Sequence, residues 1–348
     1  TAYNCFVSGV VEDSMDSVML RAAEAAETMR RGGGIGYDFS RLRPRGDLIK
    51  SLESKASGPV SFMQIFDAVC QTIASSGHRR GAQMGILRVD HPDIERFITA
   101  KQNENFLTGF NVSVGITDEF MECLQKKKPF ALRYDGRTYE EIDPVALWDM
   151  IMRSTYDWAE PGVIFVDTIN KMNNLSYCET IESCNPCGEQ PLPPFGACLL
   201  GSFNLVKYVE DGRFNFTQFQ YDIPIVVRAM DNVIDRTIYP LKEQEIEAKN
   251  KRRMGLGVTG LANALEMTGK PYASPAFTRL AKKIFATLRD HCYQASAQLA
   301  KEKGSFPLYN AEKYPQGAFI KTLAPHVQEQ IWNYGIRNSH LLSIAPTG

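Results

Sequence analysis

The spacing of apolar positions changes along the chain between a strand period and a helical period. Residues 5–11 read as a strand, and residues 14–30 carry the pattern of an amphipathic helix. The glycine-rich run 32–36 is expected to be a loop that ends this helix. A second helix is predicted over residues 61–74, with an apolar stripe made of Phe62, Ile65, Phe66, Val69 and Ile73.

The same reading predicts further strands and one long helix. Residues 110–114 alternate with period two, and the apolar run 163–166 is typical of a buried parallel strand. The clearest helix begins at Ser274-Pro275, a cap followed by proline in the first turn, and ends before Gly304. Its apolar face contains Phe277, Leu280, Ile284, Leu288, Cys292 and Leu299. Strands that alternate with helices predict an α/β fold with largely parallel pairing.

Composition excludes several classes of protein. The chain has 348 residues, 44% of them hydrophobic, so it can bury a large core in one domain or two. Its net charge of −1 gives no sign of a nucleic-acid or membrane-surface binder, and lysines 126–128 fit a solvated helix end. No apolar run approaches the ~20 residues that span a bilayer. The start does not resemble a signal peptide, so we expect a cytoplasmic protein. The abrupt ends predict a fragment or a split polypeptide.

The run Asn185-Pro186-Cys187-Gly188-Glu189 is the strongest candidate for chemistry. Pro186 favours an extended conformation at the residue before it, and Gly188 lets another group approach the thiol. In an extended backbone, positions two apart share a face, so an amide, a thiol and a carboxylate would converge on one small substrate. The alternative is a turn whose cysteine packs inward and whose glutamate is solvated.

A zinc site is a second reading of the same region. Cys178, Cys184, Cys187 and Cys198 lie close in sequence, and Cys184 and Cys187 form a Cys-x-x-Cys motif. Cys178 and Cys198 do not supply a second such pair, and zinc would leave Asn185 and Glu189 unexplained. We therefore expect no bound metal. The remaining cysteines are read as packing or incidental residues, namely Cys70, Cys123, Cys178 and Cys292.

Residues 255–260 match the Gly-x-Gly-x-x-Gly fingerprint of dinucleotide-binding proteins. That fingerprint should follow a strand and precede an acidic residue by about twenty positions. Residues 247–254 are instead polar and basic, and no acidic residue stands at that distance. We therefore interpret these glycines as a closely packed helix start.

The run 185–189 resembles the finger loop of ribonucleotide reductases, and most closely that of the adenosylcobalamin-dependent class II enzymes. Matching segments run through the whole chain, at 4–7, 12–17, 32–36, 78–82, 196–205, 252–257 and 344–348. The resemblance implies a ten-stranded α/β barrel with the finger loop at its centre. By this comparison residues 1–348 form a partial catalytic barrel domain, without the N-terminal helical region, the ATP cone and the C-terminal part.

The resemblance also implies roles for individual residues. Cys187 would carry the thiyl radical, Glu189 would be the base on the 3′-hydroxyl, and Asn185 would orient the sugar. Cys5 and Cys198 would be the dithiol that becomes a disulfide and is reduced again by a thioredoxin-like protein or a small dithiol. Adenosylcobalamin would be the cofactor, and the product would be a deoxynucleotide for DNA synthesis.

Regulation and substrate binding are implied in the same way. Asp13 would bind the ribose of a deoxynucleotide effector and Arg43 its phosphates, although a helix cap and a surface ion pair are the simpler readings. The specificity loop would comprise His78, Arg79, Arg80, Gly81, Ala82 and Gln83. The phosphates of a ribonucleoside di- or triphosphate would bind at Ala345, Pro346, Thr347 and Gly348.

The resemblance further implies a homodimer, and a second polypeptide could complete the barrel. Two other functions stay open. One is a class I large subunit, which receives its radical from a separate subunit. The other is a zinc-stabilised nucleotide-binding regulatory module without turnover.

Overall fold

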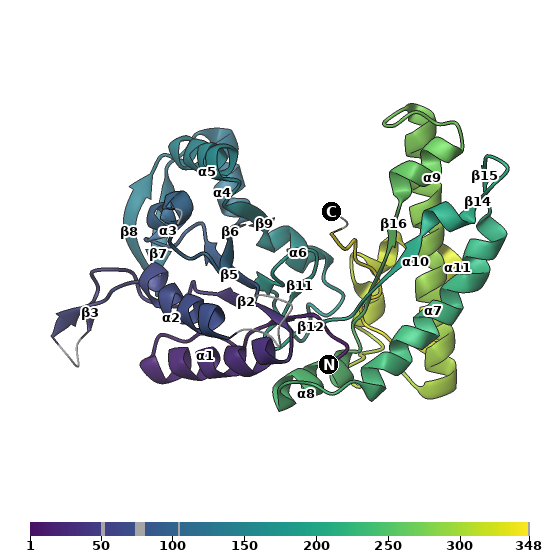
Figure 1. Cartoon of the computed structure of the whole chain (residues 1–348), viewed down its shortest axis with the longest axis horizontal. Coiled ribbons are helices and arrows are strands. Elements are labelled where there is room, and N and C mark those ends of the chain that lie inside the picture. Colours follow the sequence, from purple (N-terminus) through teal and green to yellow (C-terminus); the bar gives the residue numbers. More distant parts are fainter. Residues whose placement is uncertain (50–52, 74–80, 104, 347–348) are drawn as a thin grey trace. The chain divides into compact units, whose positions relative to one another are not determined.

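The computed structural model describes residues 1–348 except 50–52, 74–80, 104 and 347–348. The side chain of Cys198 also lies outside the described part. The chain forms two compact units. Unit 1 contains Tyr3–Lys171 and Thr180–Gly196 with Thr1, and unit 2 contains Met172–Glu179 and Ala197–Gly348 with Ala2. The elements of both are labelled in Figure 1.

Unit 1 is built on a parallel sheet. Its strands run in the order β1 (Cys5–Val7), β2 (Gly34–Asp38), β5 (Gln83–Arg88), β6 (Phe110–Ile116) and β9 (Gly162–Phe165). Helix α1 (Met15–Arg30) connects β1 to β2, and α2 (Pro59–Thr72) lies between β2 and β5 in the chain. This arrangement confirms the predicted α/β class with parallel pairing.

The two faces of this sheet differ because side chains alternate along each strand. One face packs against helix α2: the ring centroid of Tyr37 lies 4.8 Å from that of Phe66 and 6.0 Å from that of Phe110. The other face carries two sets of residues paired between neighbouring strands. Cys5 pairs with Gly34, and Gly36 pairs with Met84, which pairs with Asn111. This second face is rich in small and polar residues, and it is where the candidate site is found.

The rest of unit 1 consists of helices and short hairpins around the sheet. They are β3 (Leu48–Ile49), β4 (Ser54–Lys55), α3 (Ile94–Ile98), η1 (Ala100–Gln102), α4 (Asp118–Lys126), β7 (Phe130–Tyr134), β8 (Arg137–Ile142), α5 (Pro144–Trp158), α6 (Val166–Met172), β10 (Ser183–Cys184) and β11 (Pro191–Leu192).

Unit 2 places two long helices beside a pair of parallel strands. Strand β13 (Leu200–Asn204) pairs with β16 (Gly255–Thr259), and Leu342 forms a further parallel bridge to Leu256. Helices α7 (Phe216–Arg236) and α10 (Pro275–Lys303) pack against each other. The other elements are β12 (Ala197–Cys198), η2 (Leu205–Tyr208), β14 (Val209–Glu210), β15 (Arg213–Phe214), α8 (Lys242–Lys251), α9 (Leu261–Met267), η3 (Tyr314–Gln316), η4 (Ile320–Thr322) and α11 (Pro325–Tyr334).

A buried ionic cluster joins three segments of unit 2. Glu179 forms ion pairs with Lys251 and Arg253, and all three side chains are at most 10% exposed. Nε2 of His340 lies 3.1 Å from the side-chain oxygen of Asn173. An unpaired charge is costly inside a protein. Removing one charged member of this cluster would therefore destabilise the fold by leaving its partner unpaired.

Most of the predicted elements are confirmed, with four corrections. The run 163–166 is not a buried strand, because none of the residues of β9 (Gly162–Phe165) is buried and Val166 begins helix α6. Helix α1 begins after Ser14, whose side chain caps it, and α10 begins after Ser274 and ends at Gly304 as predicted. The predicted glycine loop is wrong, because Gly34 to Asp38 form strand β2. The first strand ends at Val7 rather than residue 11. Helix α2 starts at Pro59, and its fully buried stripe holds Val60, Met63, Phe66 and Cys70.

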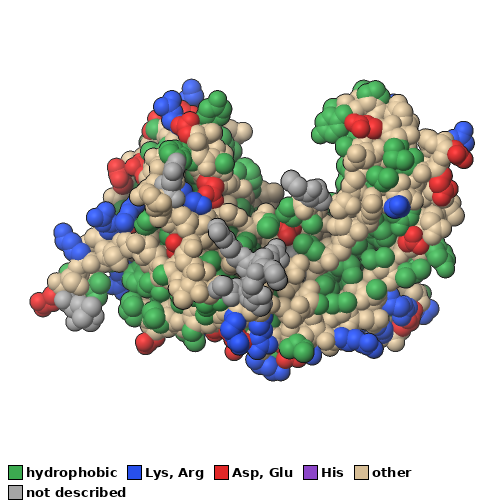
Figure 2. Space-filling model, in the orientation of Figure 1, with side chains coloured by type: hydrophobic (Ala, Val, Ile, Leu, Met, Phe, Trp, Pro, Cys, Tyr) green, Lys and Arg blue, Asp and Glu red, His purple; other side chains and the backbone are tan. Residues whose placement is uncertain are grey.

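Basic and acidic side chains are interspersed on the face shown in Figure 2. No helix in the described part of the chain combines the length and apolar content that a membrane span requires. The predicted helix start is correct only for Gly260, which precedes helix α9 with φ of +67°, because Gly255 and Gly257 lie inside strand β16, where they are buried.

Candidate active site

The candidate residues lie on a hairpin above the small-residue face of the unit 1 sheet. Strands β10 and β11 pair antiparallel, with Ser183 opposite Leu192 and Cys184 opposite Pro191. Residues 185–190 connect them. The sequence forms a hairpin here because Pro186 and Gly188 both favour a turn.

The connection is a tight turn, so the predicted extended conformation is wrong. The N–H of Gly188 donates to the carbonyl of Asn185 at 3.0 Å, and the N–H of Asn185 donates to the carbonyl of Gln190 at 3.2 Å. Gly188 has φ of +78°, a conformation that glycine adopts without strain. Cys187 nevertheless does not pack inward: it is exposed at the turn, and Glu189 is half-buried.

Asn185 is the buried member of the predicted trio. Its side chain is 0% exposed, and its Oδ1 accepts a hydrogen bond from the N–H of Gln190 at 2.9 Å. Its Nδ2 has no hydrogen-bond partner among the described residues. A buried donor without a partner is costly, so this amide is suited to a ligand oxygen.

Two glycines of β2 let the hairpin lie directly on the sheet. A Cβ atom on Gly36 would stand 1.8 Å from the carbonyl oxygen of Cys184, and one on Gly34 would stand 2.9 Å from the ring of Pro186. Cys184 packs on Met84 in the adjacent strand, and burial raises the pKa of its thiol to about 12. The hairpin is therefore seated by steric fit.

These surroundings disfavour the zinc reading. The Cys184 thiol is 0% exposed in an apolar cluster, whereas Cys187 is exposed. Within the described residues, no group of three or more His, Cys, Asp or Glu side chains is arranged to hold a metal ion. The two thiols of the motif thus face different environments.

Asn111 was missed by the sequence analysis. Its Nδ2 donates to the carbonyl of Pro186 at 2.9 Å, from strand β6 to the turn. In the sequence it is one polar residue in an alternating strand, a position usually occupied by a solvent-facing side chain, and Asn111 is exposed although its amide reaches the turn. Only the register of β6 with β5 and β2 shows that it faces the hairpin.

Cys5 and Cys187 line the same pocket. The pocket is bounded by the start of β1, the glycines before β2, and the turn, with Asn4, Gly34, Ala82 and Pro186 among its lining residues. Two cysteines from distant parts of unit 1 thus line one pocket. Cys198 ends strand β12, and its side chain lies outside the described part of the structure.

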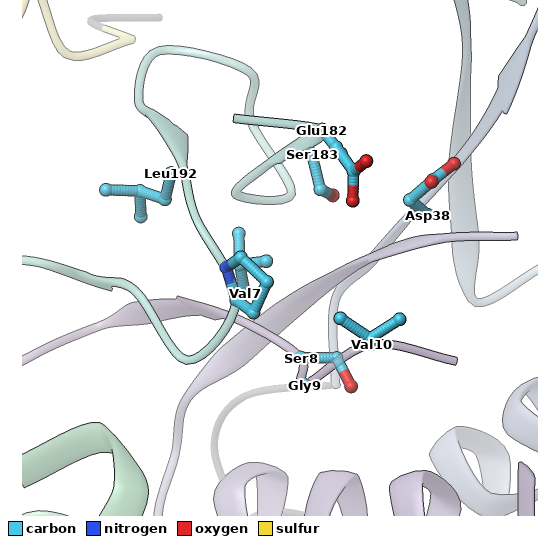
Figure 3. A pocket seen from close by; sticks show the side chains of 9 residues that line it. Val7, Ser8, Gly9, Val10, Asp38, Glu182, Ser183 and Leu192 are labelled. Carbon is cyan, nitrogen blue, oxygen red and sulfur yellow. The ribbon is translucent and has the colours of Figure 1, made fainter. Parts of the chain in front are cut away.

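A second, small pocket lies at the base of the same hairpin (Figure 3). Glu182 and Ser183 stand side by side there, and Asp38 lies on the adjacent strand. Burial, together with the nearby charge of Glu182, raises the pKa of Asp38 to about 6, against the opposing hydrogen bonds from Ser40. Arg41 pairs with Glu182 at 3.2 Å. The cavity volume of about 20 Å³, the same as that of the pocket of Cys5 and Cys187, suits a single water molecule.

The predicted effector residues lie together on the surface of unit 1. Nε of Arg43 lies 2.6 Å from a carboxylate oxygen of Asp13, and the N–H of Arg43 donates to the other oxygen at 3.1 Å. The helix cap is Ser14, so Asp13 does not fill that role. The ion pair expected from the simpler reading is present, and the carboxylate and guanidinium remain about 30% exposed.

The predicted specificity loop is described only at its end. His78, Arg79 and Arg80 lie outside the described residues. Gly81 and Ala82 line the pocket of Cys5 and Cys187. Gln83 differs from a loop residue: it begins β5, is buried, and its side chain accepts from the Tyr37 hydroxyl and donates to the Phe66 carbonyl.

The predicted phosphate-binding residues are also partly described. Ala345 and Pro346 follow Ile344 after the bridge at Leu342, without regular secondary structure. Thr347 and Gly348 lie outside the described residues.

The geometry agrees with the comparisons with known proteins. Residues 3–348 match the family model described as ribonucleotide reductase, barrel domain. The chain therefore belongs to the ribonucleotide reductase barrel family, and its parallel α/β sheet fits that fold.

Individual relatives within this family are similar to the chain over nearly all of its length. The chain is 38% identical to a vitamin B12-dependent ribonucleoside-diphosphate reductase of Mycobacterium tuberculosis (strain ATCC 25618 / H37Rv), over 99% of this chain and 47% of the relative. It is 40% identical to the enzyme of the same name from Thermoplasma acidophilum, over 99% of this chain and 43% of the relative. It is 27% identical to the ribonucleoside-diphosphate reductase large subunit of Vaccinia virus, over 99% and 50%. The chain thus spans about half the length of these relatives.

Proposed function

We propose that this chain is the catalytic barrel portion of a cobalamin-dependent ribonucleotide reductase. The observation that carries the proposal is the exposed Cys187 at the tip of a seated hairpin, in one pocket with Cys5. The names of the B12-dependent relatives support the cofactor class. The substrate would be a ribonucleoside di- or triphosphate.

The proposed reaction replaces the ribose 2′-hydroxyl with hydrogen. Cys187, as a thiyl radical, takes the hydrogen atom from C3′, and Glu189 accepts the proton of the 3′-hydroxyl as general base. The 2′-hydroxyl then leaves as water. Cys5 and Cys198 supply two electrons and two protons and become a disulfide, and the Cys187 thiol returns its hydrogen atom to C3′. The net change is one deoxynucleotide, one water and one disulfide for each ribonucleotide and dithiol.

The geometry of Asn185 fits the proposed role in orienting the sugar. Since Oδ1 is used by the N–H of Gln190, Nδ2 remains as a donor. A substrate hydroxyl oxygen at this point would satisfy the buried amide. The steric seat of the hairpin keeps this donor fixed relative to Cys187, which favours a reaction that needs close positioning.

Adenosylcobalamin, when bound, supplies a carbon-centred radical that can take a hydrogen atom from a thiol. The exposure of Cys187 fits that chemistry, because a buried thiol such as Cys184 could not be reached. We assign none of the described residues to holding the corrin.

The regulatory parts of the proposal rest on the family resemblance. Asp13 and Arg43 would exchange their mutual ion pair for the ribose and phosphates of a deoxynucleotide effector. A thioredoxin-like protein or a small dithiol would reduce the Cys5–Cys198 disulfide, and the active form would be a homodimer. A class I large subunit is the second candidate, since the Vaccinia virus relative is named a large subunit.

The proposal predicts the effect of removing the Cys187 sulfur. In the full natural protein supplied with adenosylcobalamin, ribonucleotide and dithiothreitol, Cys187→Ser should lower deoxynucleotide formation by on the order of 10³-fold or more, because oxygen does not form a comparable radical. The matched control is Cys178→Ser, an equally exposed cysteine in unit 2, which should stay within twofold.

Chromatographic quantification of deoxynucleotide separates the candidates. Product only after addition of a radical-generating subunit would support the class I reading. Product at half the normal rate or more in Cys187→Ser would contradict the proposed function.

A further inference from the structure

The central peptide of the finger turn joins Pro186 to Cys187. In a four-residue turn from Asn185 to Gly188, these are the second and third positions. Type I and type II turns differ mainly by a flip of this peptide plane, and type II requires positive φ at the third position. Cys187 is not among the non-glycine residues with positive φ, so the type II form is not adopted here.

A flip of this peptide would redirect the reactive side chain. The peptide is planar, so the direction of the Pro186 carbonyl fixes the orientation of the Cys187 N–H and the φ available to Cys187. The direction of the Cα–Cβ bond of Cys187 follows from that φ. Gly188 absorbs backbone strain at the next position and therefore does not oppose a flip.

One side chain outside the hairpin holds this carbonyl in place. Nδ2 of Asn111 donates to the carbonyl oxygen of Pro186 at 2.9 Å. Asn111 stands in the register row Gly36, Met84, Asn111, whose first two residues seat the backbone and side chain of Cys184. Across the sheet, Gly36 leaves space for the Cys184 backbone, Met84 contacts the Cys184 side chain, and Asn111 donates a hydrogen bond to the turn.

We propose that Asn111 is a positioning residue that locks the Pro186–Cys187 peptide and so aims the Cys187 thiol into the pocket it shares with Cys5. The catalytic part of this inference rests on the proposed function, whereas the positional part does not. A hydrogen bond of this kind is worth only about 1 kcal/mol net, which is small for folding but adds to the preference of Cys187, a residue other than glycine, for the turn conformer with negative φ.

Asn111→Asp tests the lock because it keeps the size of the side chain and removes the donor. The rate of Cys187 alkylation by iodoacetamide, followed by mass spectrometry, reports the orientation of the thiol without substrate or cofactor. We expect this rate to change at least threefold. Deoxynucleotide formation should fall 10- to 100-fold at unchanged KM, and the thermal midpoint should stay within about 2 °C. Asn232→Asp, the same change on an exposed residue of α7, should alter none of these.

Each outcome of the alkylation and product measurements either supports or overturns the inference. An alkylation rate within twofold of normal overturns it, and so does a changed alkylation rate with normal product formation. If the unchanged protein makes no deoxynucleotide, the proposed function fails, yet a changed alkylation rate still supports the lock. Should Asn111→Asp unfold the protein, Asn111→Ala is measured in the same way and decides on the same criteria.

Discussion

Two residues separate Cys184 from Cys187 in a single motif, and the surroundings of the two thiols are opposite. Cys184 faces the sheet, where burial raises its pKa to about 12, so it stays protonated and inert at neutral pH. Cys187 lies at the exposed tip of the turn. At the residue scale, the hairpin therefore exposes the Cys187 thiol and packs the Cys184 thiol against the sheet.

His340 provides a pH-dependent test of the ionic cluster in unit 2. Desolvation, and then the charges of Arg253 and Lys251, lower its pKa to about 3, against the opposing charge of Glu179. Between pH 6.5 and 3 the unfolded chain binds a proton that the folded protein does not, so stability should fall as the pH drops through this range.

The matching variant is His340→Gln, which cannot take up that proton. Urea unfolding at pH 7 and pH 5 should show that the unchanged protein loses about 1–2 kcal/mol more than the variant over this interval. Parallel losses in both proteins would contradict the assignment of a neutral, partly buried imidazole.

At the scale of elements, the hairpin can lie on the sheet because Gly34 and Gly36 of β2 have no side chains. Gly36→Ala would place a Cβ atom 1.8 Å from the Cys184 carbonyl, a backbone atom that cannot rotate away. The free energy of unfolding should fall by about 2 kcal/mol or more. The control is Gly115→Ala in strand β6 of the same sheet, where the nearest atoms are at 3.5 Å and the change should stay within about 1 kcal/mol. Equal effects of the two variants on urea unfolding would show that the hairpin is not seated on Gly36.

Local sequence signals predicted some of the elements, whereas features that arise from contacts between distant segments could not be predicted. Helices α1 and α10 were predictable because caps and periodic apolar residues are local signals. Strand β2 was read as a loop because glycine usually interrupts regular structure, whereas here it is needed for contact with the hairpin. Asn111 could not be found, since its role arises from a strand register between distant segments. Cys187 was predictable from its motif, but its turn conformation was not.

At the scale of the whole molecule, the family membership and the site lead to one account. The chain spans about half the length of the relatives that it matches, so the activity belongs to the proposal made above. Within unit 1, the sheet presents Cys5, and the hairpin presents Cys187, to one pocket. The account requires that the two sulfurs have different fates: Cys5 is oxidised with Cys198, and Cys187 is regenerated as a thiol.

A single-turnover reaction followed by disulfide mapping tests this requirement most directly. The fully reduced protein would be mixed with adenosylcobalamin and ribonucleotide in the absence of reductant, and then quenched with an alkylating agent for mass spectrometry. The account predicts one Cys5–Cys198 disulfide for each deoxynucleotide formed, with Cys187 recovered as an alkylated thiol. Deoxynucleotide formed while Cys5 and Cys198 remain reduced, or a disulfide that includes Cys187, would contradict it.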